Sequence, residues 1–200
     1  MRDRPIFASF YEIFSRGEDR LIRRYRRELV GGADGRVLEV GAGNGLNFTR
    51  YPPGAAVVAL EPEPTMLKNA RRRAREAAAS VRLVRGSAER LPFAPAAFDA
   101  VVFSLVLCTV PDPGRALEEA RRVLAPGGEV RFFEHVRAAE PRLARRQDRL
   151  NRAYGIFAGG CNMNRDTLGE LRRAGLRVRY RRLAYGPRMA PHVIGVATAP

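Results

Sequence analysis

The chain has 200 residues, a length that fits one domain with a single buried core. With 46% hydrophobic and 28% charged residues it reads as a soluble globular protein, and no apolar run approaches the roughly 18 residues that cross a bilayer. We therefore expect a cytoplasmic protein. The net charge of +15 would suit nucleic acid, but Lys68 is the only lysine among 36 basic residues, which indicates GC-rich coding. Because these residues are spread along the chain without interleaved aromatic residues, no nucleic-acid partner is expected.

Residues 1–34 precede the first strand and are predicted to form a helical cap. Apolar residues recur there at helical spacing, in two runs separated by Gly17: Ile6, Phe10 and Phe14, then Leu21, Tyr25 and Leu29. The opposite face carries Arg16, Arg20, Arg23, Arg24 and Arg27. The pattern predicts one or two amphipathic helices packed on the domain. Two functional alternatives are a lid over a ligand and a peripheral contact with an anionic membrane surface.

Residues 35–200 alternate between strand and helix patterns, which is typical of a parallel sheet covered on both faces. Strands are predicted at 36–40, 56–60, 81–86, 98–106, 129–135, 176–185 and 192–198. Helices are predicted at 65–78, 114–124, 143–157 and 166–175. The last two strands follow each other without a helix between them. The sequence therefore predicts an α/β fold, a Rossmann-like, doubly wound, seven-stranded sheet whose last strand is antiparallel.

A glycine-rich loop follows the first strand in "VLEVGAGNGLNF". Gly41, Gly43 and Gly45 allow a sharp turn and a close approach of the backbone to a ligand. A dinucleotide loop of the G-x-G-x-x-G type would place its third glycine at position 46, which is Leu46 here. Glu61, at the end of the second strand, can accept hydrogen bonds from both ribose hydroxyls of an adenosine. Such an acid suits NAD and S-adenosylmethionine alike, whereas Leu46 in place of glycine counts against NAD.

Further segments lie at the carboxyl ends of the predicted strands, where ligands bind in open α/β sheets. They are "GSAERLPF" and "FSLVLCTVPDP". Together with "VLEVGAGNG", "ALEPEP" and "ARRVLAPGGEVRFFEHV", their order and spacing resemble those of the class I S-adenosylmethionine-dependent methyltransferases. The stretches "SLVLC", "FFEHV" and "GGCNMNRDTL" are most similar to the methyltransferase-like thiol S-methyltransferases and their bacterial relatives.

The resemblance implies S-adenosylmethionine as cofactor and assigns residues to its parts. The implied cofactor-binding residues are Glu39, Gly41, Ala42, Gly43, Glu61, Pro62, Met66, Ser87, Ala88, Glu89, Ser104 and Leu105. Within this set the glycine loop lines the methionine moiety, Glu61 binds the ribose, and Ser104 lies near the sulfonium. Ser87 departs from the family pattern, because relatives often have an aspartate there that accepts from the adenine amino group.

The acceptor side offers fewer candidates. His135 ends the fifth predicted strand, and it is either a hydrogen-bonded structural residue or a base or substrate positioner. Cys108, Tyr154, Cys161 and Asn162 are predicted to line the substrate side, although a buried cysteine is more commonly a small apolar residue. No cysteine or histidine spacing matches a zinc motif, so no metal site is predicted.

These patterns predict an enzyme that methylates a small-molecule acceptor, with a thiol as the specific hypothesis. The absence of an Asn/Asp-Pro-Pro-aromatic motif after the fourth strand, where "SLVLC" stands, argues against methylation of base amino groups. An O- or C-methyltransferase with a quinone-like acceptor and a phospholipid N-methyltransferase remain alternatives. From other classes, an NAD-dependent oxidoreductase and a non-catalytic protein that binds RNA or S-adenosylmethionine also remain open.

Overall fold

The computed structural model describes residues 5–157, 159–183 and 190–199. Seven strands form one sheet: β1 (Arg36–Val40), β2 (Ala56–Glu61), β3 (Ser80–Arg85), β4 (Phe98–Ser104), β5 (Leu124–His135), β6 (Arg177–Arg182) and β7 (His192–Thr198). The helices are α1 (Pro5–Gly31), η1 (Phe48–Arg50), α2 (Pro64–Glu76), α3 (Pro113–Val123), α4 (Pro141–Phe157) and α5 (Thr167–Arg173). No helix in the described ranges is long and apolar enough to cross a membrane.

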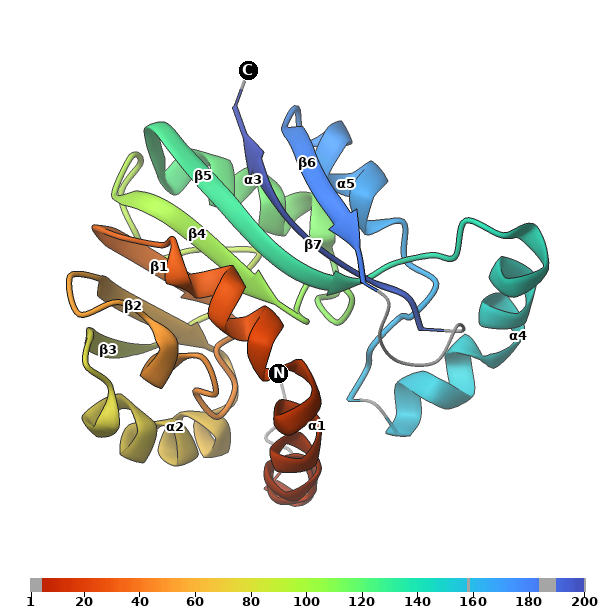
Figure 1. The fold of residues 1–200 in the computed structure, drawn as a ribbon, viewed down its shortest axis with the longest axis horizontal. Coiled ribbons are helices and arrows are strands. Elements are labelled where there is room, and N and C mark those ends of the chain that lie inside the picture. Colours follow the sequence, from red (N-terminus) through yellow and green to blue (C-terminus); the bar gives the residue numbers. More distant parts are fainter. Residues whose placement is uncertain (1–4, 158, 184–189, 200) are drawn as a thin grey trace.

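The strand order is β3-β2-β1-β4-β5-β7-β6, and β7 runs antiparallel to both of its neighbours (Figure 1). This order confirms the predicted sheet with its antiparallel last strand. The strand order reverses between β1 and β4. From β1 the chain continues to β2 and β3 on one side, and from β4 it continues to β5 on the other side. In doubly wound sheets, the crevice beside that reversal is the ordinary ligand site.

Helices cover both faces of the sheet, because successive strand residues point to opposite sides. Leu38 packs in a core with residues of α3 and α5, whereas its neighbour Val37 packs in a second core with residues of α1 and α2. Figure 1 shows α1 crossing the front of the sheet and α3 and α5 behind it. The central strands β1, β2 and β4 therefore carry nearly continuous apolar runs, as buried parallel strands require.

Helix α1 is continuous from Pro5 to Gly31, so of the one or two helices predicted here the structure forms one, which runs through Gly17. Glycine weakens a helix interior by about 1 kcal/mol relative to alanine, which a long helix tolerates. The buried face also differs by one position from the expected one. Leu21 is 68% exposed, whereas Ile22 is fully buried together with Tyr25 and Leu29. The predicted exposure of the arginine face is confirmed at Arg20, Arg23, Arg24 and Arg27.

The other element boundaries shift by a few residues. The largest difference is in β5, which begins at Leu124 because Leu124 pairs with Phe98 before an irregularity in the ladder. Residues 184 and 185 of the predicted sixth strand lie outside the described residues.

Helix α4 extends beyond the carboxyl end of β5 (Figure 1). Leu150 of this helix is 49% exposed, so an apolar stripe does not hold it to the domain. A fully buried amide, that of Gln147, anchors the helix instead. Its Oε1 accepts the Ala138 N–H at 2.8 Å, and its Nε2 donates to the carbonyls of Val136 and Met163 at 3.3 and 2.9 Å.

Candidate functional site

The glycine loop leaves β1 at the reversal of strand order and turns back on itself. Gly41, Gly43 and Gly45 have φ values of +66°, +56° and +81°, a region that favours glycine. At Gly41 an added Cβ would lie 2.6 Å from Cγ2 of Val106. The loop therefore needs glycine for its dihedral angles and, at Gly41, also for space against the segment that follows β4.

Glu61 joins the end of β2 to this loop. Its Oε2 accepts the Gly43 N–H at 2.9 Å, and its Oε1 accepts the Glu63 N–H at 3.0 Å. The residue is only 7% exposed, and burial raises the pKa of its carboxyl group. Two carboxylate oxygens offer about four acceptor positions, so further donors can still bind. Gly86, at the end of β3, donates its N–H to the Glu61 carbonyl at 3.3 Å and brings the third strand end to the same place.

A pocket lies between the glycine loop and α1. Its lining residues are Arg26, Glu39, Gly41, Ala42, Gly43, Asn44, Leu46, Asn47 and Ser104. Glu39 forms part of the floor, accepting from Asn47 Nδ2 at 2.7 Å and from the Tyr51 hydroxyl at 3.0 Å. Burial raises the pKa of Glu39 to about 7, although these donors and Arg26 favour its charged form.

Arg26 enters this pocket from α1 and was not among the predicted site residues. It is 3% exposed, and its Nη1 donates to Asn47 Oδ1 at 3.2 Å and to Ser104 Oγ at 3.0 Å. Its Nε lies 3.4 Å from the Asp19 carboxylate. Arg26 lies on the same face of the helix as Ile22 and Leu29. A single cation on an otherwise apolar helix face is the signal by which the sequence could have indicated this residue.

The turn after β4 forms the other wall. Leu105 has φ +60°, an uncommon value for a residue with a side chain, and donates its N–H to the Phe133 carbonyl at 2.8 Å. The buried Glu134 accepts the N–H groups of Val106, Leu107 and Cys108 at 2.8, 2.9 and 3.3 Å. Strained backbone held by surrounding bonds is common at functional sites.

The predicted adenine-side residues are less closely gathered. Met66 is buried in the first turn of α2, and Ala88 is buried in the turn after β3. Ser87 is exposed, and its hydroxyl donates to Glu89. Together with the half-buried Pro62, these residues follow the ends of β2 and β3.

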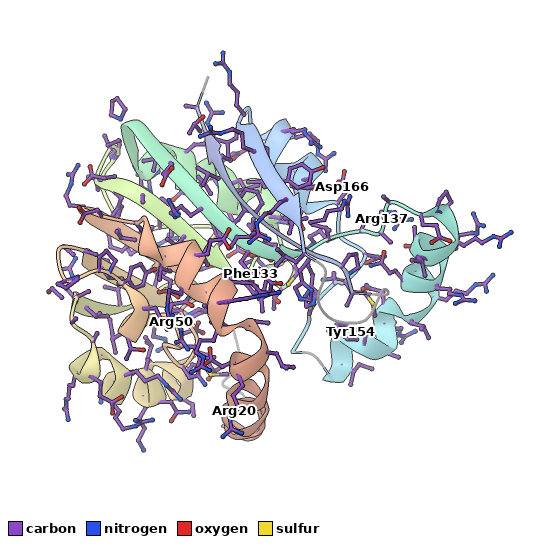
Figure 2. All side chains as sticks on the ribbon, in the orientation of Figure 1. Arg20, Arg50, Phe133, Arg137, Tyr154 and Asp166 are labelled. Atoms are coloured by element: carbon purple, nitrogen blue, oxygen red, sulfur yellow. The ribbon has the colours of Figure 1, made fainter. Side chains whose placement is uncertain are left out.

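The predicted acceptor-side residues converge beyond the ends of β4 and β5. Cys161 Sγ lies 3.3 Å from His135 Nδ1, and the ligand atoms of Cys108, His135 and Cys161 are all within 4.8 Å of one another. Asn162 donates its backbone N–H to the Cys108 carbonyl at 2.8 Å. The Tyr154 ring meets that of His135 edge-on, 6.4 Å between centroids, and Figure 2 shows Tyr154 on α4 facing the end of the sheet.

Comparison with known proteins places this site in context. The family profile described as "Methyltransferase domain" matches residues 38–132. Human thiol S-methyltransferase TMT1B is 36% identical over 151 residues, which are 72% of this chain and 61% of that protein. Phosphatidylethanolamine N-methyltransferase of Cereibacter sphaeroides is 34% identical over 137 residues, which are 64% of this chain and 68% of that protein. The chain thus spans about three fifths of the human relative.

A solved structure shares the whole fold. A SAM-dependent methyltransferase of Thermotoga maritima superposes with a TM-score of 0.74 and covers 98% of each chain, at 23% identity. At that identity the likeness extends to the fold alone. The seven-stranded sheet and its flanking helices are therefore shared with that protein.

Proposed function

The chain belongs to the class I S-adenosylmethionine-dependent methyltransferases, and on this premise we propose that it transfers the cofactor's methyl group to a small-molecule thiol. The observation that supports cofactor binding most strongly is the bond between Glu61 and Gly43, which unites the acid of β2 with the glycine loop of β1. The thiol acceptor is supported by the similarity to a human thiol S-methyltransferase.

The residues of the pocket, with Glu61 bonded to its Gly43 wall, fit the chemical parts of the cofactor. Glu61 is a buried carboxylate with acceptor positions for the two ribose hydroxyls. Arg26 presents a guanidinium to the space beside the glycine loop, where it would pair with the carboxylate of the methionine moiety. Gly41 and Gly43 let the backbone approach closely. The cofactor, when bound, supplies a methyl group activated on a sulfonium.

The remaining task of the protein is to hold the acceptor in line with that methyl group and to exclude water. A small thiol has a pKa near 8.5, so a few per cent is already thiolate at neutral pH. Ser104 and Leu105 belong to the pocket wall after β4. They precede Cys108 of the Cys108–His135–Cys161 group in the chain. We assign His135, Tyr154 and Asn162 to the acceptor side, where His135 would position the acceptor or take its proton.

A calorimetric titration tests the cofactor assignment. Purified protein is titrated with S-adenosylhomocysteine and, separately, with NADH. Micromolar binding of S-adenosylhomocysteine without binding of NADH supports the proposal. The opposite order would reinstate the oxidoreductase reading. A screen of small thiols, followed by detection of the methyl sulfide and of S-adenosylhomocysteine in equal amounts, then tests the acceptor.

A second candidate is methylation of a phospholipid amine. It is favoured by the similarity to a phosphatidylethanolamine N-methyltransferase and by the exposed arginine face of α1, where Arg20, Arg23 and Arg27 point to solvent. Figure 2 shows Arg20 on the outer part of α1. Sedimentation with anionic vesicles containing phosphatidylethanolamine, followed by lipid methylation, distinguishes the two candidates. Turnover of soluble thiols without vesicle binding removes the second.

A further inference from the structure

The group formed by Cys108, His135 and Cys161 has the chemistry and compactness of a metal centre. Their relative exposures are 1%, 6% and 5%, so two thiols and an imidazole face one another away from solvent. These side chains come from three separate parts of the chain: the segment after β4, the end of β5, and the loop before α5. The three residues are so far apart along the chain that no sequence motif contains them. For this reason no metal site was predicted.

The distances suit a tetrahedral ion. Zinc–sulfur bonds of about 2.3 Å and zinc–nitrogen bonds of about 2.0–2.1 Å place neighbouring ligand atoms roughly 3.5–3.8 Å apart in a tetrahedron. The ligand atoms here lie within 4.8 Å of one another, and the Cys161–His135 pair is at 3.3 Å. Side-chain shifts of a few tenths of an ångström to about one ångström would reach coordination distances.

Hydrogen bonds hold the backbones of Cys108, of His135 and of Asn162, which follows Cys161. The Cys108 carbonyl accepts the backbone N–H of Asn162 at 2.8 Å and its side-chain Nδ2 at 3.3 Å. The hydroxyl of Thr167 donates to the His135 carbonyl at 3.0 Å. The Cys108 N–H donates to the carboxylate of Glu134 at 3.3 Å. Outer contacts of this kind orient metal ligands before the ion arrives.

We propose that Cys108, His135 and Cys161 bind one Zn²⁺ ion and leave its fourth position for a thiol ligand. Two thiolates balance the charge of the ion, so the buried centre is neutral apart from the fourth ligand. Thiolate and imidazole are the ligands that zinc prefers. Three protein ligands with one open position are the arrangement of catalytic zinc sites, whereas structural sites use four.

The fourth ligand extends the proposed function, and this step rests on it. Gly160 and Asn162, which flank Cys161, line an open surface pocket together with Asn151 and Gly155 of α4. A thiol entering there would replace a zinc-bound water. Its sulfur would form a bond to zinc, its proton would pass to solvent, and the water would leave. The metal would thereby hold the acceptor as a thiolate at neutral pH, since a coordinated thiol is deprotonated.

Metal binding is tested on the whole chain without cofactor or acceptor. Reduced protein is stripped with a chelator and titrated with Zn²⁺, and bound metal is measured by mass spectrometry. We expect one zinc per chain, a rise in melting temperature, and loss of binding in Cys108→Ala, Cys161→Ala and His135→Ala. His192→Phe is the matched control, because it keeps a ring against His135, whose centroid lies 4.0 Å away. It should retain the ion.

Two results would overturn the zinc site. One is the absence of zinc from reduced wild-type protein in which both thiols remain titratable. The other is zinc binding that survives all three substitutions. If the variants do not fold, the stoichiometry and the melting temperature of the wild type with and without chelator still decide. S-adenosylhomocysteine binding is measured separately, so failure here is distinct from failure of the proposed function.

Cobalt reports on the open position. Co²⁺ in place of Zn²⁺ should give the visible bands of a tetrahedral ion and a thiolate-to-metal charge-transfer band. A small thiol added without cofactor should strengthen the charge-transfer band and shift the visible bands, whereas the corresponding alcohol should not. Unchanged spectra at saturating thiol would contradict thiol coordination and leave a purely structural metal.

Discussion

Glu61 and Gly43 are joined by a hydrogen bond of 2.9 Å, so the acid that ends β2 and the loop that follows β1 move as one unit. The affinity of a ligand that binds the Glu61 carboxylate therefore also depends on the position of the loop. This coupling is the basis of the first prediction.

Replacing Glu61 with alanine should weaken S-adenosylhomocysteine binding at least tenfold, with the far-ultraviolet circular dichroism spectrum unchanged. Hydrogen bonds to a charged group contribute roughly 1.5–3 kcal/mol each, and the substitution removes the acceptors for the ribose and for the loop. Titration calorimetry measures the change. Glu76→Ala is the control, because Glu76 is a carboxylate at the far end of α2 that pairs with Arg72. Wild-type affinity in Glu61→Ala would place the ribose elsewhere.

Alanine at Gly41 should abolish cofactor binding and destabilise the fold by several kcal/mol. The substitution combines a positive φ with a Cβ 2.6 Å from Val106. Gly127→Ala separates the two effects, because its φ is +77° and an added Cβ there meets nothing within 4 Å. That variant should lose only about 1 kcal/mol and bind normally. Equal losses in urea unfolding of the two variants would show that the contact with Val106 is unimportant.

Arg26→Gln should weaken binding of S-adenosylhomocysteine about tenfold or more while leaving adenosine binding nearly unchanged. The expected loss is the ion pair with the ligand's carboxylate, which adenosine lacks. Arg27→Gln removes the same charge from an exposed neighbouring position and serves as the control. If Arg26→Gln lowered the affinity for both ligands equally, Arg26 would act by holding α1 against the loop rather than by contacting the ligand.

The buried Glu39 should make stability depend on pH. Its pKa is about 4.5 in the unfolded chain and about 7 in the folded protein, so the unfolded chain loses its proton first as the pH rises. Stability is therefore lost between pH 4.5 and 7, by up to about 3 kcal/mol from this group. Glu39→Gln should remove that contribution. The free energy of unfolding of both proteins is measured in urea at pH 5 and pH 8. If it changed by the same amount between the two pH values in both proteins, Glu39 would be ionised throughout.

Substitution of His135 by alanine should lower turnover about 100-fold but change S-adenosylhomocysteine affinity less than threefold. The ring lies on the acceptor side, beside Cys161, and positioned acid–base or metal-binding groups contribute on this scale. Steady-state kinetics with a thiol acceptor and calorimetry give the two numbers. Normal turnover would return His135 to a structural role.

The sequence predicted that the glycine loop and Glu61 lie together, and the structure joins them through the Gly43 N–H, because the sheet topology brings the ends of β1 and β2 side by side. Their role in binding the cofactor stays a prediction. Arg26 was missed because a single cation on an apolar helix face has no periodic signature. The Cys108–Cys161 proximity was missed because it depends on where the ends of β4 and β5 meet the loop before α5, which local patterns do not encode. The pattern around Gly17 left one or two helices open, and the structure forms one because the intrinsic cost of glycine is small compared with the packing along α1.

The polar attachment of α4 through Gln147 has a consequence for which parts of this fold tolerate substitution. A segment anchored mainly by one amide and its three backbone partners can be exchanged, lengthened or reshaped without repacking the apolar cores that set the glycine loop. The exposed positions of α4 can therefore be substituted without disturbing the strands beside them. Selection can then alter acceptor choice in this segment while the cofactor half stays constant.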